Sequence, residues 1–267
     1  MLTINSFTDK SSDEKHKVNQ DRFFYSSSSF FGDEDITILV IADGMGGLSN
    51  GELAAEKGIK SFIDCYYNKI IELYHSVDVY TFSITYKLEL LKEILLDSVI
   101  KANEEVCNNC TPYEEMGTTL SVVCIVRDYA FVLNVGDSPV YLYRNREEKI
   151  ELVSKIMTKA EKKVEDGEYS RGSKEYYSDS HLIYCSLGRY ETLTEEDIYI
   201  NSIGRLQPGD SIILGSDGAF GRLNEYDILE YFEEWESGGS FLKKMINHAR
   251  NQVDDDATAI ICEIKGD

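Results

Sequence analysis

Apolar residues recur along the chain with two different periods. Short runs rich in β-branched and aromatic residues predict strands at residues 2–7, 21–25 and 35–41. Two longer segments follow in which apolar residues return every three or four positions, as on one face of a helix. These positions are Ala55, Ile59, Phe62, Ile63, Tyr66 and Ile70, then Leu88, Leu91, Leu95, Ser98 and Ala102. Two successive helices are expected to cover one face of a sheet.

The middle of the chain is dense in strand-like runs separated by turn signals. We interpret them as an antiparallel meander. Its expected strands lie at 117–126, 129–135, 140–144 and 150–153. The serine-rich stretch at 26–35 predicts a hairpin loop. From about 157 to 180 aliphatic residues almost disappear, which predicts a long mobile flap.

The second half ends with a strand, two helices and a last strand. They are expected within 206–220, near 225–232, near 241–249 and at 257–264. This order predicts an α+β fold in which two sheets face each other and helices cover both outer faces. No stretch has the composition of a linker, so residues 1–267 are expected to form one domain.

The chain is strongly acidic, with 27 Lys and Arg against 48 Asp and Glu and a net charge of −21. Such a charge repels phosphate backbones and anionic lipids, so nucleic acids and membranes are not expected as partners. For most of these acids, solubility is explanation enough. No apolar run is long enough to cross a bilayer, and the first residues do not resemble a secretion signal. We therefore expect a cytoplasmic protein whose six cysteines are thiols.

Cys107 and Cys110 have the CxxC spacing of some metal and redox sites. A structural zinc site needs a second pair of ligands, which does not follow with suitable spacing. A redox pair normally opens a helix, whereas this pair closes one. We expect no chemistry here.

Aspartates stand repeatedly where an apolar strand ends or begins. Asp43, Asp137 and Asp217 follow predicted strands, Asp21 precedes one, and residues 254–256 precede the last. Each could simply form a turn or a cap. Together they favour a site, because converging carboxylates repel one another unless a cation neutralises them. Oxygen donors without His or Cys favour Mg²⁺ or Mn²⁺ over zinc.

Five segments in this order resemble the metal-dependent protein phosphatase family, protein phosphatase 2C. They are VNQDRFF, IADGMGGLSNGE, GTTLSVVCI with NVGDSPVYL, LQPGDSIILGSDGAFGRL and VDDDATAIICEI. The resemblance implies a four-layer α/β/β/α sandwich with a dinuclear Mn²⁺ or Mg²⁺ centre. It also implies hydrolysis of phosphoserine and phosphothreonine in proteins by a water held between the metals. The substrates would be those of a Ser/Thr kinase in a signalling system, and the enzyme is expected to be a monomer.

The resemblance assigns roles to particular residues. Asp43 matches the acid that bridges both metals, and the Gly44 carbonyl matches a ligand of one of them. Asp217 and Asp255 match ligands of the other metal. Asp21 matches an acid that acts near the metals, partly through water.

Three further positions depart from the family or extend its pattern. Asp137 matches a ligand of a third, weaker metal site, but Gly221 stands where relatives often carry another acid for it. His16 stands where the family usually has a phosphate-binding arginine, with Lys17 as a neighbouring cation. Neither side chain reproduces the bidentate guanidinium, and His16 can equally be a solvent-exposed residue.

These departures leave a second hypothesis, a pseudophosphatase that keeps the fold and binds partners with little or no turnover. A third, a metal-dependent nuclease, conflicts with the net charge of −21. Within the flap, five cations form a basic island that could help to retain substrates, although a solvated loop explains them as well. They are Lys159, Lys162, Lys163, Arg171 and Lys174.

Overall fold

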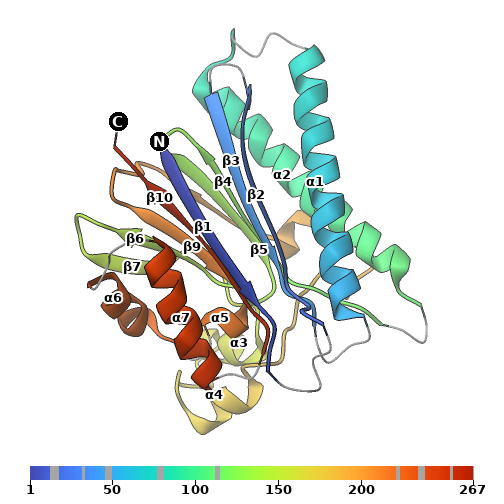
Figure 1. The fold of residues 1–267 in the computed structure, drawn as a ribbon. Coiled ribbons are helices and arrows are strands. Elements are labelled where there is room, and N and C mark those ends of the chain that lie inside the picture. The colour runs from blue at the N-terminus through green and yellow to red at the C-terminus, as the bar shows by residue number, and fades with distance from the viewer. Residues whose placement is uncertain are drawn as a thin grey trace.

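The computed structural model describes residues 1–12, 18–31, 34–45, 50–76, 81–111, 115–220, 223–233, 238–252 and 255–266. Within these ranges, strands form two five-stranded antiparallel sheets that lie face to face (Figure 1). The first sheet has the order β1 (Leu2–Asp9), β10 (Ala257–Ile264), β9 (Ser211–Gly215), β6 (Val140–Arg144) and β7 (Lys149–Leu152). The second has the order β2 (Arg22–Phe31), β3 (Glu34–Ala42), β4 (Leu120–Val126), β5 (Tyr129–Val135) and β8 (Tyr199–Ile203).

Helices cover the outer face of each sheet (Figure 1). The long helices α1 (Gly51–Ser76) and α2 (Ile84–Asn109) pack on the second sheet. The shorter α5 (Asp217–Phe220), α6 (Glu225–Glu233) and α7 (Gly238–Gln252) pack on the first. This confirms the predicted α/β/β/α sandwich. In the described part of the chain, no helix is both long enough and apolar enough to span a bilayer.

Strand β3 explains why the central strands are apolar almost without interruption. Ile38 and Val40 face the helices α1 and α2, whereas Leu39 and Ile41 face the first sheet. Successive side chains of a strand point to opposite faces, so a strand buried on both faces needs apolar residues throughout. Alternation of apolar and polar residues would therefore not have revealed it.

Residues 26–31 of the serine-rich stretch belong to strand β2 and not to the predicted hairpin loop. Ser26 pairs with Ile38 in the register of β2 and β3, and Ser27 Oγ lies 2.7 Å from Thr37 Oγ1. The serine hydroxyls find partners across the strand pair and on α1, where Ser26 bonds to Tyr67. Polar composition alone therefore gave the wrong structure here.

The predicted meander is divided between the two sheets. β4 pairs with β5 in the second sheet, while β6 and β7 belong to the first, and β8 was not predicted. The chain crosses between the sheets at Gly136, whose φ of +106° suits glycine. The flap contains two short helices, α3 (Lys159–Glu165) and α4 (Lys174–Asp179), rather than a stretch without secondary structure.

Candidate functional site

Five of the predicted site aspartates lie at one edge of the sandwich. Asp43 follows β3 and Asp21 precedes its antiparallel neighbour β2, in which Arg22 pairs with Ala42. Asp217 follows β9 and Asp255 precedes β10, again an antiparallel pair. Asp137 lies on the crossover from β5 to β6. Antiparallel neighbours reverse direction, so the end of one strand lies beside the start of the next.

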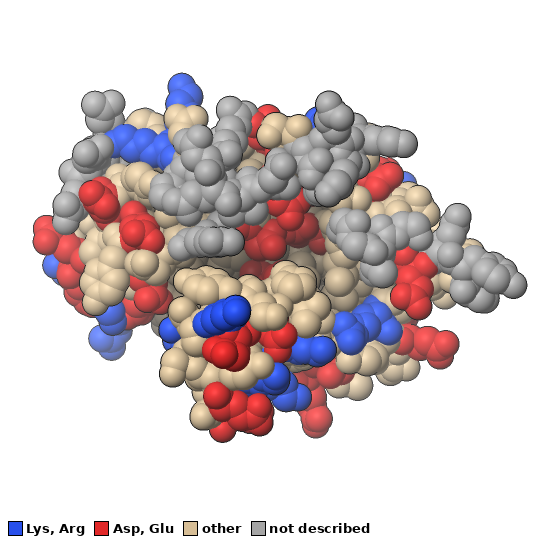
Figure 2. Space-filling model, turned by 90° about the horizontal axis from the view of Figure 1, so that it is seen from below, with Lys and Arg blue, Asp and Glu red and all other residues tan. Residues whose placement is uncertain are grey.

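Seen from the end of the sandwich where these strands meet, acidic side chains gather inside a hollow (Figure 2). Their charges raise the pKa of the most deeply buried among them. Burial raises the pKa of Asp43 well above its usual range, and repulsion from Asp21, Asp217, Asp137 and Asp255 adds to the shift. Mutual repulsion on this scale means that the five carboxylates share one electrostatic environment.

Asp21 and Asp137 are themselves deeply buried. Burial raises the pKa of Asp21 to about 7. Hydrogen bonds from the hydroxyls of Thr258 and Ser216 lower this pKa in part, and repulsion from Asp217 adds to the rise. Burial also raises the pKa of Asp137 well above its usual range, with Asp217 adding to the effect. Such buried carboxylates favour either a proton or a cation beside them.

Buried hydroxyl groups hold the turns that carry these acids, and the sequence analysis did not single them out. Asp43 N–H donates to Thr119 Oγ1 at 3.0 Å, and Thr118 Oγ1 donates to the Asp43 carbonyl at 2.8 Å. Thr119 Oγ1 lies 2.6 Å from Ser138 Oγ, next to Asp137. These hydroxyls link the Asp43 turn to the Asp137 turn, and the only signal for them is their position beside the acidic motifs.

Gly44 lies where the chain leaves no room for a side chain. A Cβ atom there would lie 2.2 Å from the carbonyl oxygen of Gly51 and 2.8 Å from that of Gln20. Gly51 begins α1, so the turn after Asp43 packs directly against the start of that helix. The glycine is required by this close approach of three backbone segments.

Asp256 is an anchor for the backbone near Asp21. It is only 3% exposed, and its carboxylate accepts hydrogen bonds from Ser11 N–H at 2.7 Å and from Gln20 N–H at 2.8 Å. Its neighbour Asp255 is exposed, as is Asp217. The two adjacent aspartates therefore differ in position: one supports the segment before β2, and the other is open to the solvent side of the hollow.

The donors at this edge fit a hard divalent cation by their chemistry. All are oxygens, and Asp21 Oδ1 is buried without a hydrogen-bond partner among the described residues. Within those same residues, no three His, Cys, Asp or Glu side chains are arranged closely enough to hold an ion together. The charge and the donor type therefore fit a hard divalent cation.

The predicted phosphate-binding residues His16 and Lys17 lie outside the described residues, as does Gly221. In the flap, Arg171 donates to Glu161 through both Nε and Nη2, at 3.1 and 2.8 Å.

Lys163 bonds to Tyr169 and Asp179. Arg171 and Lys163 thus form ion pairs within the flap. Lys159, Lys162 and Lys174 are exposed, as is Arg171 itself.

Cys107 and Cys110 are free thiols, as are the other four cysteines. The Sγ of Cys107 lies 3.2 Å from the Tyr190 carbonyl, and that of Cys110 lies 3.9 Å from the Gly188 carbonyl. Burial raises the pKa of Cys107, which disfavours the reactive thiolate. These contacts are those of packing residues at the end of α2.

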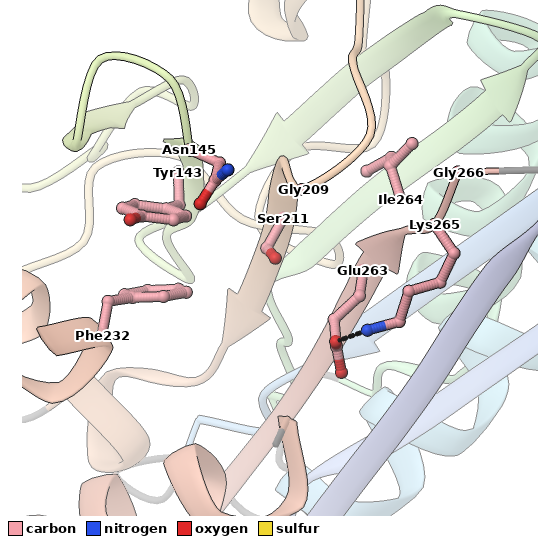
Figure 3. A pocket seen from close by; sticks show the side chains of 9 residues that line it. All are labelled: Tyr143, Asn145, Gly209, Ser211, Phe232, Glu263, Ile264, Lys265 and Gly266. Carbon is pink, nitrogen blue, oxygen red and sulfur yellow. Dashed lines mark hydrogen bonds and ion pairs between the residues drawn. The ribbon is translucent and has the colours of Figure 1, made fainter. Parts of the chain in front are cut away.

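A separate pocket lies at the other end of the first sheet (Figure 3). The rings of Tyr143 and Phe232 stack there, with centroids 4.0 Å apart, and Glu263 forms an ion pair with Lys265. The pocket adjoins Ser211, the first residue of β9, whereas Asp217 follows the last. It is therefore remote from the acidic edge.

Comparison with known proteins identifies relatives over most of the chain. The family model described as protein phosphatase 2C matches residues 9–254. The serine/threonine phosphatase stp of Listeria monocytogenes is 25% identical over 193 residues, which are 72% of this chain and 70% of the relative. A putative protein phosphatase 2C-type protein of Streptococcus pyogenes is 22% identical, over 81% of this chain and 79% of that protein.

Solved structures show the same fold. The serine/threonine phosphatase of S. agalactiae superposes with a TM-score of 0.79 at 19% identity, over 99% of this chain and 100% of that one. The catalytic domain of the phosphatase PstP, in complex with two manganese ions, superposes with a TM-score of 0.71 at 21% identity, over 99% of both chains. At these identities the structural similarity establishes the fold.

Proposed function

The chain belongs to the protein phosphatase 2C family of protein-serine/threonine phosphatases, and we propose that it hydrolyses phosphoserine and phosphothreonine in proteins with the help of divalent cations. The observation that carries this proposal is the meeting of five aspartates from both sheets at one edge, where the other four raise the pKa of Asp43. A cluster of that charge suits a site for cations and phosphate together.

Each residue of the edge has a proposed part. Asp43, at the centre of the cluster, would bridge two cations, with the Gly44 carbonyl as a further ligand. Asp217 and Asp255, which face the open side, would complete the second cation site. The cations would be Mn²⁺ or Mg²⁺, and a relative of the same fold was solved with two manganese ions. Asp137 would serve a third, weaker site.

When bound, such cations lower the pKa of a water and neutralise the charge of the phosphate. The chain's own part would be to position that water: Asp21 Oδ1, which has no hydrogen-bond partner among the described residues, would accept a hydrogen bond from it, while Oδ2 is bonded to Ser216. No cysteine or serine nucleophile is required, since the attacking group is water.

The proposed substrates are proteins phosphorylated by a Ser/Thr kinase, in cytoplasmic signalling, and the proposed active form is a monomer. The names of the relatives support the substrate class. The net charge of −21 supports the exclusion of nucleic acid and anionic membranes. Light scattering of the purified protein tests the oligomeric state. His16 and Gly221, the two residues that suggested a pseudophosphatase, lie outside the described residues. None of the described residues favours a pseudophosphatase.

The test is release of phosphate from a phosphoserine peptide with Mn²⁺ and, separately, with excess EDTA. We expect turnover only with the cation. Asp217→Asn should abolish it while the fold is kept, because the amide removes the charge needed for the cation. Asp128→Asn is the matched control, since Asp128 is exposed in the turn between β4 and β5. Wild-type turnover by Asp217→Asn would contradict the proposal.

A further inference from the structure

Ser216 is a fully buried serine that contacts two other acid-bearing segments while directly preceding Asp217. Its Oγ donates a hydrogen bond to Asp21 Oδ2 at 2.9 Å. The same Oγ accepts a hydrogen bond from Thr258 N–H at 3.0 Å, and Ser216 N–H donates to the Thr258 carbonyl at 2.9 Å. Ser216 therefore joins the segment before β2, which carries Asp21, to the start of β10, which follows Asp255.

The hydrogen bond to Asp21 crosses from one sheet to the other. Ser216 follows β9 of the first sheet, whereas Asp21 precedes β2 of the second. A hydroxyl has a single proton to donate. Two acceptors lie within its reach, Asp21 Oδ2 at 2.9 Å and the Thr258 carbonyl at 3.5 Å, and the shorter contact favours Asp21.

The carboxylate of Asp21 is consequently held by one oxygen only. Asp21 N–H donates to Asn19 Oδ1 at 2.8 Å, which fixes the main chain, and Ser216 fixes Oδ2. Asp21 is only 4% exposed, and its second oxygen, Oδ1, is buried with no hydrogen-bond partner in the described part of the chain. Buried polar atoms are nearly always satisfied, so an unsatisfied carboxylate oxygen at this edge indicates a missing ligand.

We propose that Ser216 is a positioning residue, which orients Asp21 so that Oδ1 faces the divalent cations and their water. The inference rests on the proposed function, because it concerns how this chain presents one acid to those cations. Alanine at position 216 would remove the hydrogen bond that Ser216 donates to Oδ2 of the Asp21 carboxylate. The carboxylate could then rotate, because this bond no longer fixes Oδ2 while Oδ1 has no partner among the described residues.

A purely structural role for Ser216 makes a different prediction. The bonds between Ser216 and Thr258 tie β9 to β10 whether or not Asp21 is present. Ser216→Ala removes the side-chain bond from Thr258 N–H to Oγ, and that loss would lower stability in every background. Loss of the bond to Asp21 can weaken cation binding only while Asp21 is there, so a double-mutant cycle separates the two roles.

The experiment compares the wild type, Ser216→Ala, Asp21→Ala and the double variant. Mn²⁺ affinity is measured by calorimetry, the Mn²⁺ environment by electron paramagnetic resonance, and the unfolding midpoint in EDTA. Residues that orient ligands typically change metal affinity by roughly 10- to 100-fold. We expect Ser216→Ala to weaken Mn²⁺ binding by about tenfold and to alter the Mn²⁺ spectrum. In the Asp21→Ala background the same substitution should change the affinity by less than about twofold.

Ser98→Ala is the matched control. Ser98 is also fully buried, and its Oγ donates to the Ile94 carbonyl within α2, away from the acidic edge. It should leave Mn²⁺ affinity unchanged. If Ser216→Ala does not fold, Ser216→Cys replaces the hydroxyl with a weaker donor and should give an intermediate loss of affinity.

Two results would overturn the inference while leaving the proposed function intact. One is wild-type Mn²⁺ affinity in the serine variant; the other is an equal loss of affinity with and without Asp21. A wild-type protein that binds no Mn²⁺ would instead refute the proposed function, and the inference with it.

Discussion

Replacing Asp256 with alanine tests how the segment that carries Asp21 is held in place. The Asp256 carboxylate accepts hydrogen bonds from Ser11 N–H at 2.7 Å and Gln20 N–H at 2.8 Å. Both distances are those of charge-assisted bonds, and the side chain is almost completely buried. The substitution removes the carboxylate that accepts both hydrogen bonds, so Ser11 N–H and Gln20 N–H each lose this acceptor.

The expected loss of stability follows from those two bonds. A hydrogen bond to a charged group contributes about 1.5–3 kcal/mol, so two of them give an upper range of roughly 3–6 kcal/mol. Removing Asp256 also relieves its repulsion with Asp21, which acts in the opposite direction. We expect a net loss of about 3 kcal/mol for Asp256→Ala, and about half of that for Asp256→Asn, whose amide oxygen can keep one N–H.

The assay is urea unfolding followed by circular dichroism, in EDTA so that bound cations do not contribute. Asp128→Ala, an exposed aspartate, is the control and should change the unfolding free energy by less than about 0.5 kcal/mol. If Asp256→Ala were as stable as that control, the two hydrogen bonds would not anchor the segment before β2, and our account of it would be wrong.

Three further predictions concern the turn, the flap and the cations. Gly44→Ala should destabilise the fold by about 1–3 kcal/mol and reduce phosphate release, because its Cβ would lie 2.2 Å from a backbone oxygen; Gly204→Ala, whose Cβ would lie 3.5 Å from its nearest neighbour, should do neither. Burial alone would raise the pKa of Glu161, but its hydrogen bonds with Arg171 outweigh burial and the pKa is lowered. Glu161 therefore stabilises the folded protein above the unfolded pKa of about 4.3, and this contribution disappears as the pH falls through the folded pKa. Glu161→Gln should therefore lose about 1 kcal/mol at neutral pH and show a flatter acid unfolding curve; an unchanged curve would contradict this reasoning. Mn²⁺ at 100 times its dissociation constant should stabilise the wild type by about 2.7 kcal/mol, measured by thermal unfolding, and EDTA should reverse the effect; an equal gain in Asp217→Asn would exclude that residue as a ligand.

Several features of the site follow from local sequence. A run of β-branched residues predicts a strand whatever its tertiary surroundings, and an aspartate that follows the run is then expected at the end of the strand. Asp43 and Asp217 are examples, and the antiparallel pairs β2–β3 and β9–β10 bring Asp21 and Asp255 to the same edge. The helical period of α1 and its start at Gly51 are likewise local.

Other features depend on contacts between distant segments. The serine run at 26–29 became a strand because its hydroxyls meet Thr37 and Tyr67, which composition cannot show. The chain crosses from β5 to β6 at Gly136, so strands that looked like one meander lie in different sheets. Their pairing depends on which apolar faces fit together, a property of the assembled core.

The order of strands and helices, the aspartates and their place at strand ends could be predicted from the sequence, because these depend on neighbours within a few residues. Which polar groups support the acids became evident only in the folded structure. Asp256, next to Asp255 in the chain, holds the backbone of Gln20, and Ser216 reaches Asp21, 195 residues away. Hydrogen bonds between such distant residues exist only once two sheets are packed face to face. For that reason the candidate metal-binding aspartates could be predicted from the sequence, whereas the hydrogen bonds that position them could not.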